Sequence, residues 1–246
     1  TTGVLATLGY DLSYEVLLEG VRKVKEAIQN GAASIAGIHL EGPYTNPDFG
    51  FPAERYLTPD PEKLVPIFEE GKGLIKLMTL APELEGNEAV AKLAQQYGIT
   101  LSVGHSRASE EQIYHFRKYG LKVACHHMNA CGASYKMNLG IRTVGVSEAV
   151  MASDDITAEI IPDYEGIHVR PLNIRYTIKC KGVDHVAIIT DSCSHGEPYY
   201  AQEKNLPNDC DINMVNNTLC GSWMNMSKAC YNMKRHSGES MVNVFK

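Results

Sequence analysis

The sequence predicts an α/β protein built as a TIM-like (β/α)8 barrel from which one strand is missing. Short apolar runs alternate with amphipathic runs of helical period along the whole chain, which is typical of βα units around a parallel sheet. The length of 246 residues suits one barrel domain,, and no linker, composition break or internal repeat divides it. We therefore expect residues 1–246 to form a single, partial domain, with a doubly wound open sheet as the alternative fold.

About seven strands are predicted from short apolar and β-branched runs bounded by turn residues. They cover residues 4–8, 34–40, 74–80, 100–103, 122–125, 157–161 and 186–190. Helices are predicted between them at 14–30, 88–97 and 109–119. The first repeats Val16, Leu17, Val21, Val24 and Ile28 at helical spacing and ends at Gly31,. The third begins with Ser109, whose side chain can cap its first turn.

Composition and charge exclude several classes of protein. The formal net charge is −6 and the basic residues are scattered, which argues against nucleic-acid binding. No run approaches the ~20 apolar residues of a membrane span, and the start lacks the charged lead of a signal peptide. The seven cysteines form an odd set without CxxC spacing, which favours reduced structural thiols. We expect a cytoplasmic enzyme.

Polar residues follow the strands where a barrel enzyme places its active site, at the carboxyl ends. Glu41 follows the second predicted strand, His105 the fourth, His126 the fifth and Asp191 the seventh. His39 lies two positions before Glu41 on the same face and is expected to support it. The shared location predicts one site formed by these side chains.

Two imidazoles and a carboxylate form the ligand set of many catalytic Zn²⁺ sites, in which a water molecule completes the coordination. Glu41, His105 and His126 are the expected ligands, and the same donors also accept Fe²⁺, Mn²⁺ or Co²⁺. A bound cation lowers the pKa of water and supplies hydroxide for attack on a carbonyl. Asp191 is the expected general acid and base, and His168 is a candidate to bind the substrate.

At these motifs the sequence resembles the N-acetylglucosamine-6-phosphate deacetylases of the amidohydrolase superfamily. The matching elements are TTGVLAT at Thr1, GIHLEGPY at Gly37, LAPE at Leu80, GHSRA at Gly104, HHMNA at His126, EGIHV at Glu165, TDS at Thr190 and LCGSWMNM at Leu219.

The resemblance implies a metal-dependent hydrolase that removes the N-acetyl group of N-acetylglucosamine 6-phosphate. It assigns Glu41, His105 and His126 to the metal, Asp191 to catalysis and His168 to substrate contact. A pocket for the sugar phosphate would be lined by Asn129, Ala130, Leu219, Cys220, Gly221 and Ser222. The resemblance also implies a homodimer, and a β-sandwich and a first barrel strand that are missing here, so the chain is expected to be a fragment. Without that strand, the sequence leaves open whether one metal ion or two are bound.

Two departures from the family concern the substrate. Gly50-Phe51-Pro52 replaces a Gly-Ala-His segment that meets the sugar, and the family's phosphate-binding Arg-Glu-Pro-Gly is absent near Leu139. Arg142 and Lys136 are the remaining candidates to bind a phosphate. The alternatives are therefore an amidohydrolase acting on another N-acyl or cyclic amide, and a catalytically inactive sugar-binding barrel.

Overall fold

The structure, a computed structural model, describes residues 3–9, 11–50, 56–132, 140, 144–193, 197–198, 212–215 and 218–246. The chain divides into two compact units, Thr1–Cys125 with Ala130–Ala149 and His126–Asn129 with Val150–Lys246. Each unit is described by itself.

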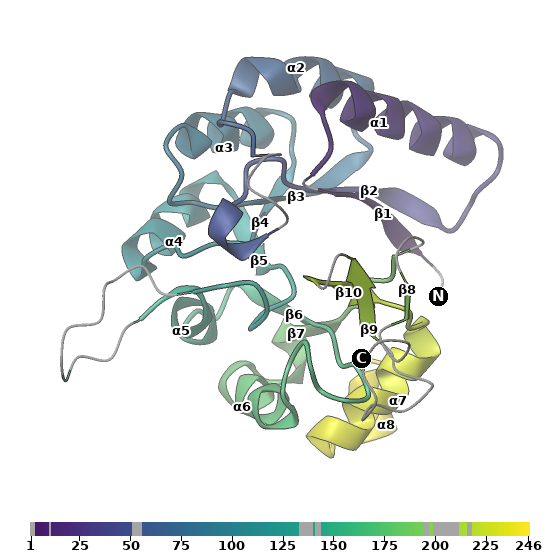
Figure 1. The fold of residues 1–246 in the computed structure, drawn as a ribbon, viewed down its shortest axis with the longest axis vertical. Coiled ribbons are helices and arrows are strands. Elements are labelled where there is room, and N and C mark those ends of the chain that lie inside the picture. Colours follow the sequence, from purple (N-terminus) through teal and green to yellow (C-terminus); the bar gives the residue numbers. More distant parts are fainter. Residues whose placement is uncertain are drawn as a thin grey trace. The chain divides into compact units, whose positions relative to one another are not determined.

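The first unit contains a parallel sheet whose strands follow chain order (Figure 1). Its strands are β1 (Val4–Leu8), β2 (Ile35–Glu41), β3 (Ile75–Leu80), β4 (Thr100–Val103) and β5 (Leu121–Ala124). Each of these five strands lies within one residue of its predicted bounds. The inner strands β3 and β4 are buried almost continuously along their length, because both faces of the sheet are covered, as in parallel sheets generally,.

Helices connect these strands, and three of the four α-helices described here begin at a residue with a capping side chain. They are α1 (Tyr14–Gln29), α2 (Pro61–Glu70), α3 (Asn87–Gln96) and α4 (Glu110–Phe116), with the 3-10 turns η1 (Pro47–Phe49) and η3 (Arg117–Tyr119). Ser13 caps α1, Asp60 caps α2, and Ser109 forms a capping box with Gln112 at α4,. The predicted third helix is thus an α-helix that tightens into a 3-10 turn.

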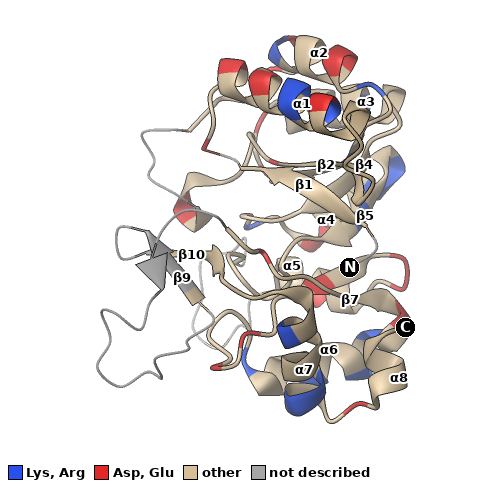
Figure 2. Ribbon diagram, turned by 90° about the vertical axis from the view of Figure 1, so that its right-hand side faces the viewer, with Lys and Arg blue, Asp and Glu red and all other residues tan. Residues whose placement is uncertain are grey.

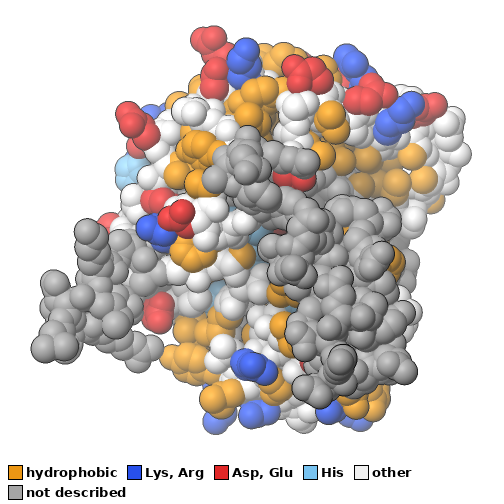
Figure 3. Space-filling view, in the orientation of Figure 1, with side chains coloured by type: hydrophobic (Ala, Val, Ile, Leu, Met, Phe, Trp, Pro, Cys, Tyr) orange, Lys and Arg blue, Asp and Glu red, His pale blue; other side chains and the backbone are white. Residues whose placement is uncertain are grey.

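Helices α1 and α2 pack together and present a charged outer surface. Leu17 and Val21 of α1 are buried, and burying each contributes roughly 2 kcal/mol. Lys25 of α1 donates to Glu70 of α2 across 2.9 Å. Acidic and basic residues are interspersed along the ribbons of both helices in Figure 2, and hydrophobic side chains lie between charged side chains on this part of the surface in Figure 3.

The second unit contains two strands that pair in parallel, β6 (Thr157–Ile160) and β7 (Val186–Ile188). Its helical segments are α6 (Pro171–Lys181), η4 (Val183–His185), α7 (Met226–Ser237) and α8 (Met241–Val244), and α5 (Val146–Met151) contains the boundary between the units. Ile160, Val169, Ile174 and Met233 form a buried cluster between these elements.

A small antiparallel sheet was not anticipated from the sequence. It contains β8 (Glu197–Pro198), β9 (Ile212–Val215) and β10 (Thr218–Ser222), in the order β10-β9-β8. Residues 219–222, which the resemblance assigns to the sugar-phosphate pocket, lie in a strand, because Thr218 and Leu219 pair with Val215 and Met214. Among the described helices, none is long and apolar enough to cross a membrane.

Candidate active site

Glu41 and His105 are brought together in the first unit. Glu41 is the last residue of β2, and His105 follows β4 after one glycine. Nε2 of His105 lies 2.9 Å from Oε1 of Glu41, and both side chains are about nine-tenths buried. The prediction that these strand ends converge is correct for this pair.

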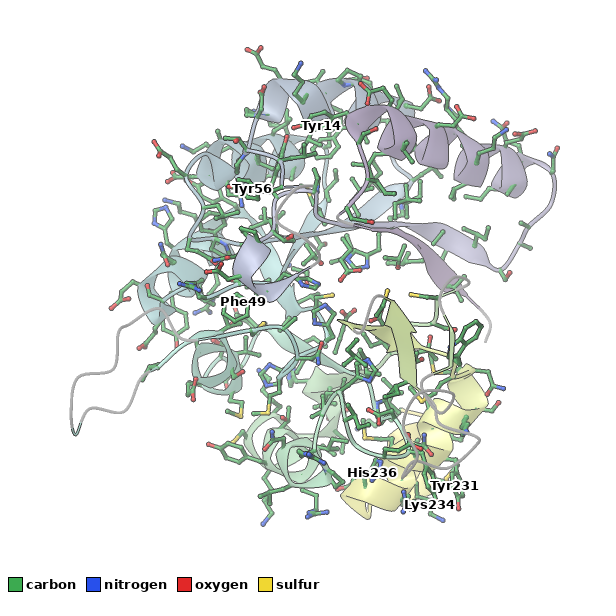
Figure 4. The ribbon with its side chains drawn as sticks, viewed as in Figure 1. Tyr14, Phe49, Tyr56, Tyr231, Lys234 and His236 are labelled. Atoms are coloured by element: carbon green, nitrogen blue, oxygen red, sulfur yellow. The ribbon has the colours of Figure 1, made fainter. Side chains whose placement is uncertain are left out.

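The hydrogen bonding of His105 leaves an acceptor facing an acceptor. Its Nδ1 lies 2.6 Å from the carbonyl oxygen of Phe49, which is labelled in Figure 4. A carbonyl only accepts, so Nδ1 carries the hydrogen and a neutral ring presents its Nε2 lone pair to Glu41. Two lone pairs at this distance require a proton or a cation between them. The pair therefore fits a metal ion.

A buried cysteine lies beside Glu41 in the first unit. Sγ of Cys125 lies within 4.8 Å of a carboxylate oxygen of Glu41. Cys125 directly follows β5, and its backbone N–H donates to Val103 of β4 across 2.9 Å. Treating all cysteines as structural overlooked this residue, because its proximity to Glu41 depends on the pairing of strands far apart in the sequence.

Glu83 anchors the loop that contains His105, a role that was not predicted, although Glu83 belongs to the LAPE motif. One carboxylate oxygen accepts from Asn46 Nδ2 at 2.9 Å and from the backbone N–H of Arg107 at 2.7 Å. The other accepts from the Ser106 hydroxyl at 2.7 Å. Glu83 thus joins the loop after β2 to the loop after β4.

His39 lies in β2, and two of its hydrogen bonds reach the neighbouring strands. Nε2 lies 2.8 Å from Oγ1 of Thr79 in β3, and Nδ1 lies 3.4 Å from Oγ1 of Thr7 in β1. Thr79 is the register partner of Glu41. His39 therefore holds the strands beside Glu41, and its expected support of that residue acts through the sheet.

His126 and Asn129 lie in a turn of the second unit. The carbonyl oxygen of Asn129 lies 3.3 Å from Nδ1 of His126, so Nδ1 carries the hydrogen and Nε2 is the lone-pair nitrogen of the neutral ring,. Asn129 also reaches the His168 carbonyl oxygen with its side-chain amide at 3.5 Å, a weak contact,. This turn places His126, Asn129 and His168 near one another.

His168 is held by Asp163, a residue that was not among the predicted site residues. Oδ2 of Asp163 lies 3.1 Å from Nδ1 of His168 and accepts its backbone N–H at 2.8 Å. Burial would raise the pKa of Asp163, but the hydrogen bonds from His168 and Ile167 outweigh it and lower that pKa. Nε2 of His168 is buried without a hydrogen-bond partner among the described residues. A polar atom in this situation is suited to meet a ligand.

Asp191 is tied to the strand that contains Leu219, Cys220, Gly221 and Ser222. Ser222 donates its backbone N–H to the Asp191 carbonyl at 2.8 Å and its hydroxyl to the Thr190 carbonyl at 2.5 Å. A Cβ on Gly221 would lie 2.2 Å from the Asp191 carbonyl oxygen, so only glycine fits there. The expected acid/base and most of the expected pocket residues are neighbours in this unit.

Positive φ angles mark the same positions. Among the described non-glycine residues they occur at His105, His126, Met128, Ala130 and Asp191, which all follow a strand. Such angles cost free energy and cluster at functional sites, where the surrounding structure maintains them. This independent backbone property supports the site predicted from strand ends.

Two predicted phosphate contacts, Arg142 and Lys136, lie outside the described residues. Ala130, a predicted pocket residue, lies in the first compact unit. His236 of α7 (Figure 4) is buried, and its Nε2 lies 2.7 Å from the Asp163 carbonyl oxygen. His236 therefore packs around Asp163.

No family model matches the sequence, but individual proteins do. The chain is 29% identical over 210 residues to N-acetylglucosamine-6-phosphate deacetylase of Lysinibacillus sphaericus, covering 82% of this chain and 52% of the relative. It is 32% identical over 201 residues to N-acetylgalactosamine-6-phosphate deacetylase of Shewanella, covering 79% of this chain and 47% of the relative. The chain spans about half the length of these curated relatives.

A solved structure gives the same result for the fold. N-acetylglucosamine-6-phosphate deacetylase of Thermotoga maritima superposes with a TM-score of 0.79 at 27% identity, covering 99% of this chain and 66% of that one. The parallel strands and connecting helices are thus those of a TIM-barrel amidohydrolase. In sequence and in fold, this chain is a homologue of the N-acetylglucosamine-6-phosphate deacetylases.

Proposed function

We propose that this protein is a metal-dependent hydrolase that removes the N-acetyl group from an amino-sugar 6-phosphate. The observation that carries the proposal is the buried contact of His105 Nε2 with Glu41 Oε1, in which two acceptors face each other at 2.9 Å. The names of the relatives supply the reaction and the substrate class.

Glu41, His105 and His126 are the proposed metal ligands, with Zn²⁺ as the expected ion. His126 directly follows Cys125, whose sulfur lies close to Glu41. Nδ1 of His105 donates to the Phe49 carbonyl and Nδ1 of His126 donates to the Asn129 carbonyl, which fixes the nitrogen that each ring presents, as second-layer carbonyls do for metal-binding histidines. When bound, the cation polarises the substrate carbonyl and makes water acidic near neutral pH.

Asp191 is the proposed general acid and base. Its carboxylate accepts a proton from the attacking water and returns it to the leaving nitrogen, so that acetate and a free amine are formed. The positive φ of Asp191 and its tie to Ser222 fix the backbone from which this side chain extends. A fixed backbone limits the positions that the carboxylate can reach.

His168 is proposed to bind the substrate through Nε2. Asp163 holds Nδ1, so the neutral ring offers Nε2 as an acceptor, and a protonated ring offers it as a donor,. Asn129, Ala130 and residues 219–222 would line the sugar pocket, and Arg142 would bind the phosphate.

The test is acetate release by the full-length protein with Zn²⁺. N-acetylglucosamine 6-phosphate, its unphosphorylated form and N-acetylgalactosamine 6-phosphate are compared, because the names of the relatives include both 6-phosphates. We expect phosphate-dependent release that falls by roughly 10²- to 10⁴-fold in Asp191→Asn.

Asp184→Asn is the matched control, because Asp184 lies at the other end of β7 and its side chain is exposed. Its activity should equal that of the unmodified protein. If metal-loaded protein released no acetate from any of these sugars, the amino-sugar assignment would be wrong and other amides would be tested next.

A further inference from the structure

Cys125 occupies a position that structural packing alone does not account for. It is 3% exposed and directly follows β5. Its sulfur lies within 4.8 Å of a Glu41 carboxylate oxygen, and Oε1 of Glu41 lies 2.9 Å from Nε2 of His105. A sulfur donor that follows β5 and a nitrogen donor that follows β4 thus lie beside the carboxylate at the end of β2, all in one compact unit.

We propose that Cys125 is a thiolate ligand of the metal ion held by Glu41 and His105. This inference rests on the proposed function for the presence of a metal ion. It adds a ligand to the set derived from the sequence, in which cysteines had no part.

The distances are compatible with shared coordination. Zinc binds sulfur at roughly 2.3 Å and carboxylate oxygen at roughly 2.0–2.2 Å, so the two donors of one ion lie at most about 4.5 Å apart. The bound of 4.8 Å for Cys125 and Glu41 is met with at most a small rotation of either side chain.

A buried cysteine more often serves as a small apolar residue. Cys230 of α7 is such a case, because burial raises the pKa of its thiol and it packs within a helix. Cys125 differs because its sulfur lies beside a buried carboxylate. An apolar side chain at this position would leave the negative charge of the carboxylate uncompensated unless a cation were bound. With a cation, the thiol loses its proton and becomes a strong ligand.

A thiolate changes what the metal centre prefers and does. Soft sulfur favours Zn²⁺ or Co²⁺ over Mn²⁺ or Mg²⁺, which prefer oxygen donors. The thiolate also brings a second negative charge beside Glu41, which reduces the net positive charge of the loaded centre. We therefore expect Cys125→Ser to weaken Zn²⁺ and Co²⁺ binding more than Mn²⁺ binding.

The experiment uses full-length protein stripped with a chelator and reloaded with one equivalent of Co²⁺. A cobalt–thiolate bond gives a charge-transfer absorption in the near ultraviolet, whereas nitrogen and oxygen ligands give only the weaker visible bands. We expect the charge-transfer band in the unmodified protein and its loss in Cys125→Ser. That variant should still bind Co²⁺, at least about tenfold more weakly, as altered metal environments commonly do.

Cys131→Ser is the matched control, because Cys131 is a second thiol of the same unit that is only partly buried. The band should persist in this variant. Circular dichroism of Cys125→Ser and Cys125→Ala checks that both fold, and serine retains the size of the side chain.

The outcomes separate the two proposals. Stoichiometric Co²⁺ with visible bands but no charge-transfer band would overturn the thiolate ligand and leave the metal centre intact. A band that persists in Cys125→Ser or disappears in Cys131→Ser would also overturn it. Failure to bind any metal ion would refute the proposed function itself, and the thiolate ligand with it.

Discussion

Removing the carboxylate of Glu83 should destabilise the first unit and weaken its metal site together. Glu83 accepts hydrogen bonds from Asn46, Ser106 and the backbone of Arg107. Asn46 in turn donates its backbone N–H to the carbonyl oxygen of His105 at 2.8 Å. The loop that places His105 beside Glu41 is therefore held by one carboxylate.

The magnitude follows from the three hydrogen bonds that Glu83→Ala removes. A bond to a charged group contributes roughly 1.5–3 kcal/mol. Glu83 is only partly buried, and bonds within one network are not additive,. We therefore expect a loss of about 3 kcal/mol in the free energy of unfolding. Glu83→Gln, which keeps acceptor oxygen but no charge, should lose less.

Urea unfolding of the metal-free protein measures this loss, with a lower midpoint at an unchanged slope. Glu85→Ala is the matched control, because Glu85 is exposed in the same turn and should change stability by less than about 0.5 kcal/mol,. A chelator competition should show weaker Zn²⁺ binding in Glu83→Ala alone. A Glu83→Ala protein as stable as the Glu85→Ala control would refute the reasoning.

Three further predictions concern the second unit. Gly221→Ala should lower deacetylation strongly, because the new Cβ would meet the Asp191 carbonyl oxygen at 2.2 Å. Gly238→Ala, also at positive φ but in open space, should cost only about 1 kcal/mol of stability,. Kinetics and unfolding of both variants distinguish the two effects. Because the pKa of Asp163 is held below its ordinary 3.8, its contribution is present above that pH and is lost as the pH falls through the folded pKa, by at most about 1.4 kcal/mol per pH unit. Acid unfolding of Asp163→Asn should lack this dependence, and a variant that matched the original curve would contradict it. Lys181→Met should cost about 2 kcal/mol in urea unfolding, since the buried ammonium donates to the carbonyls of Val150 and Ser153,, while the exposed Lys179→Met should be neutral.

The strands were predictable because their signal is local. Leu101 and Val103 of β4 (Thr100–Val103) and the stop at Gly104 are visible in the sequence, and the predicted and observed bounds agree. The sheet of β8, β9 and β10 was missed because short antiparallel strands carry too few residues for a period to emerge,.

Much of the candidate site was also predictable, for a topological reason. Parallel strands joined by helices have their carboxyl ends at one edge, so Glu41 and His105 could be paired from order alone. Their 2.9 Å contact bears this out within the first unit. The metal-ligand roles of Glu41, His105 and His126 stay predictions.

By itself, the sequence determined the alternation of strands and helices and which polar residues follow each strand, because both depend on neighbours along the chain. The tertiary structure decided which side chains touch. Glu83 joins loops after β2 and β4, and the sulfur of Cys125 lies close to the carboxylate of Glu41, 84 positions earlier in the numbering. Such contacts arise only when strand pairing fixes the backbone, so no local pattern of residues predicts them.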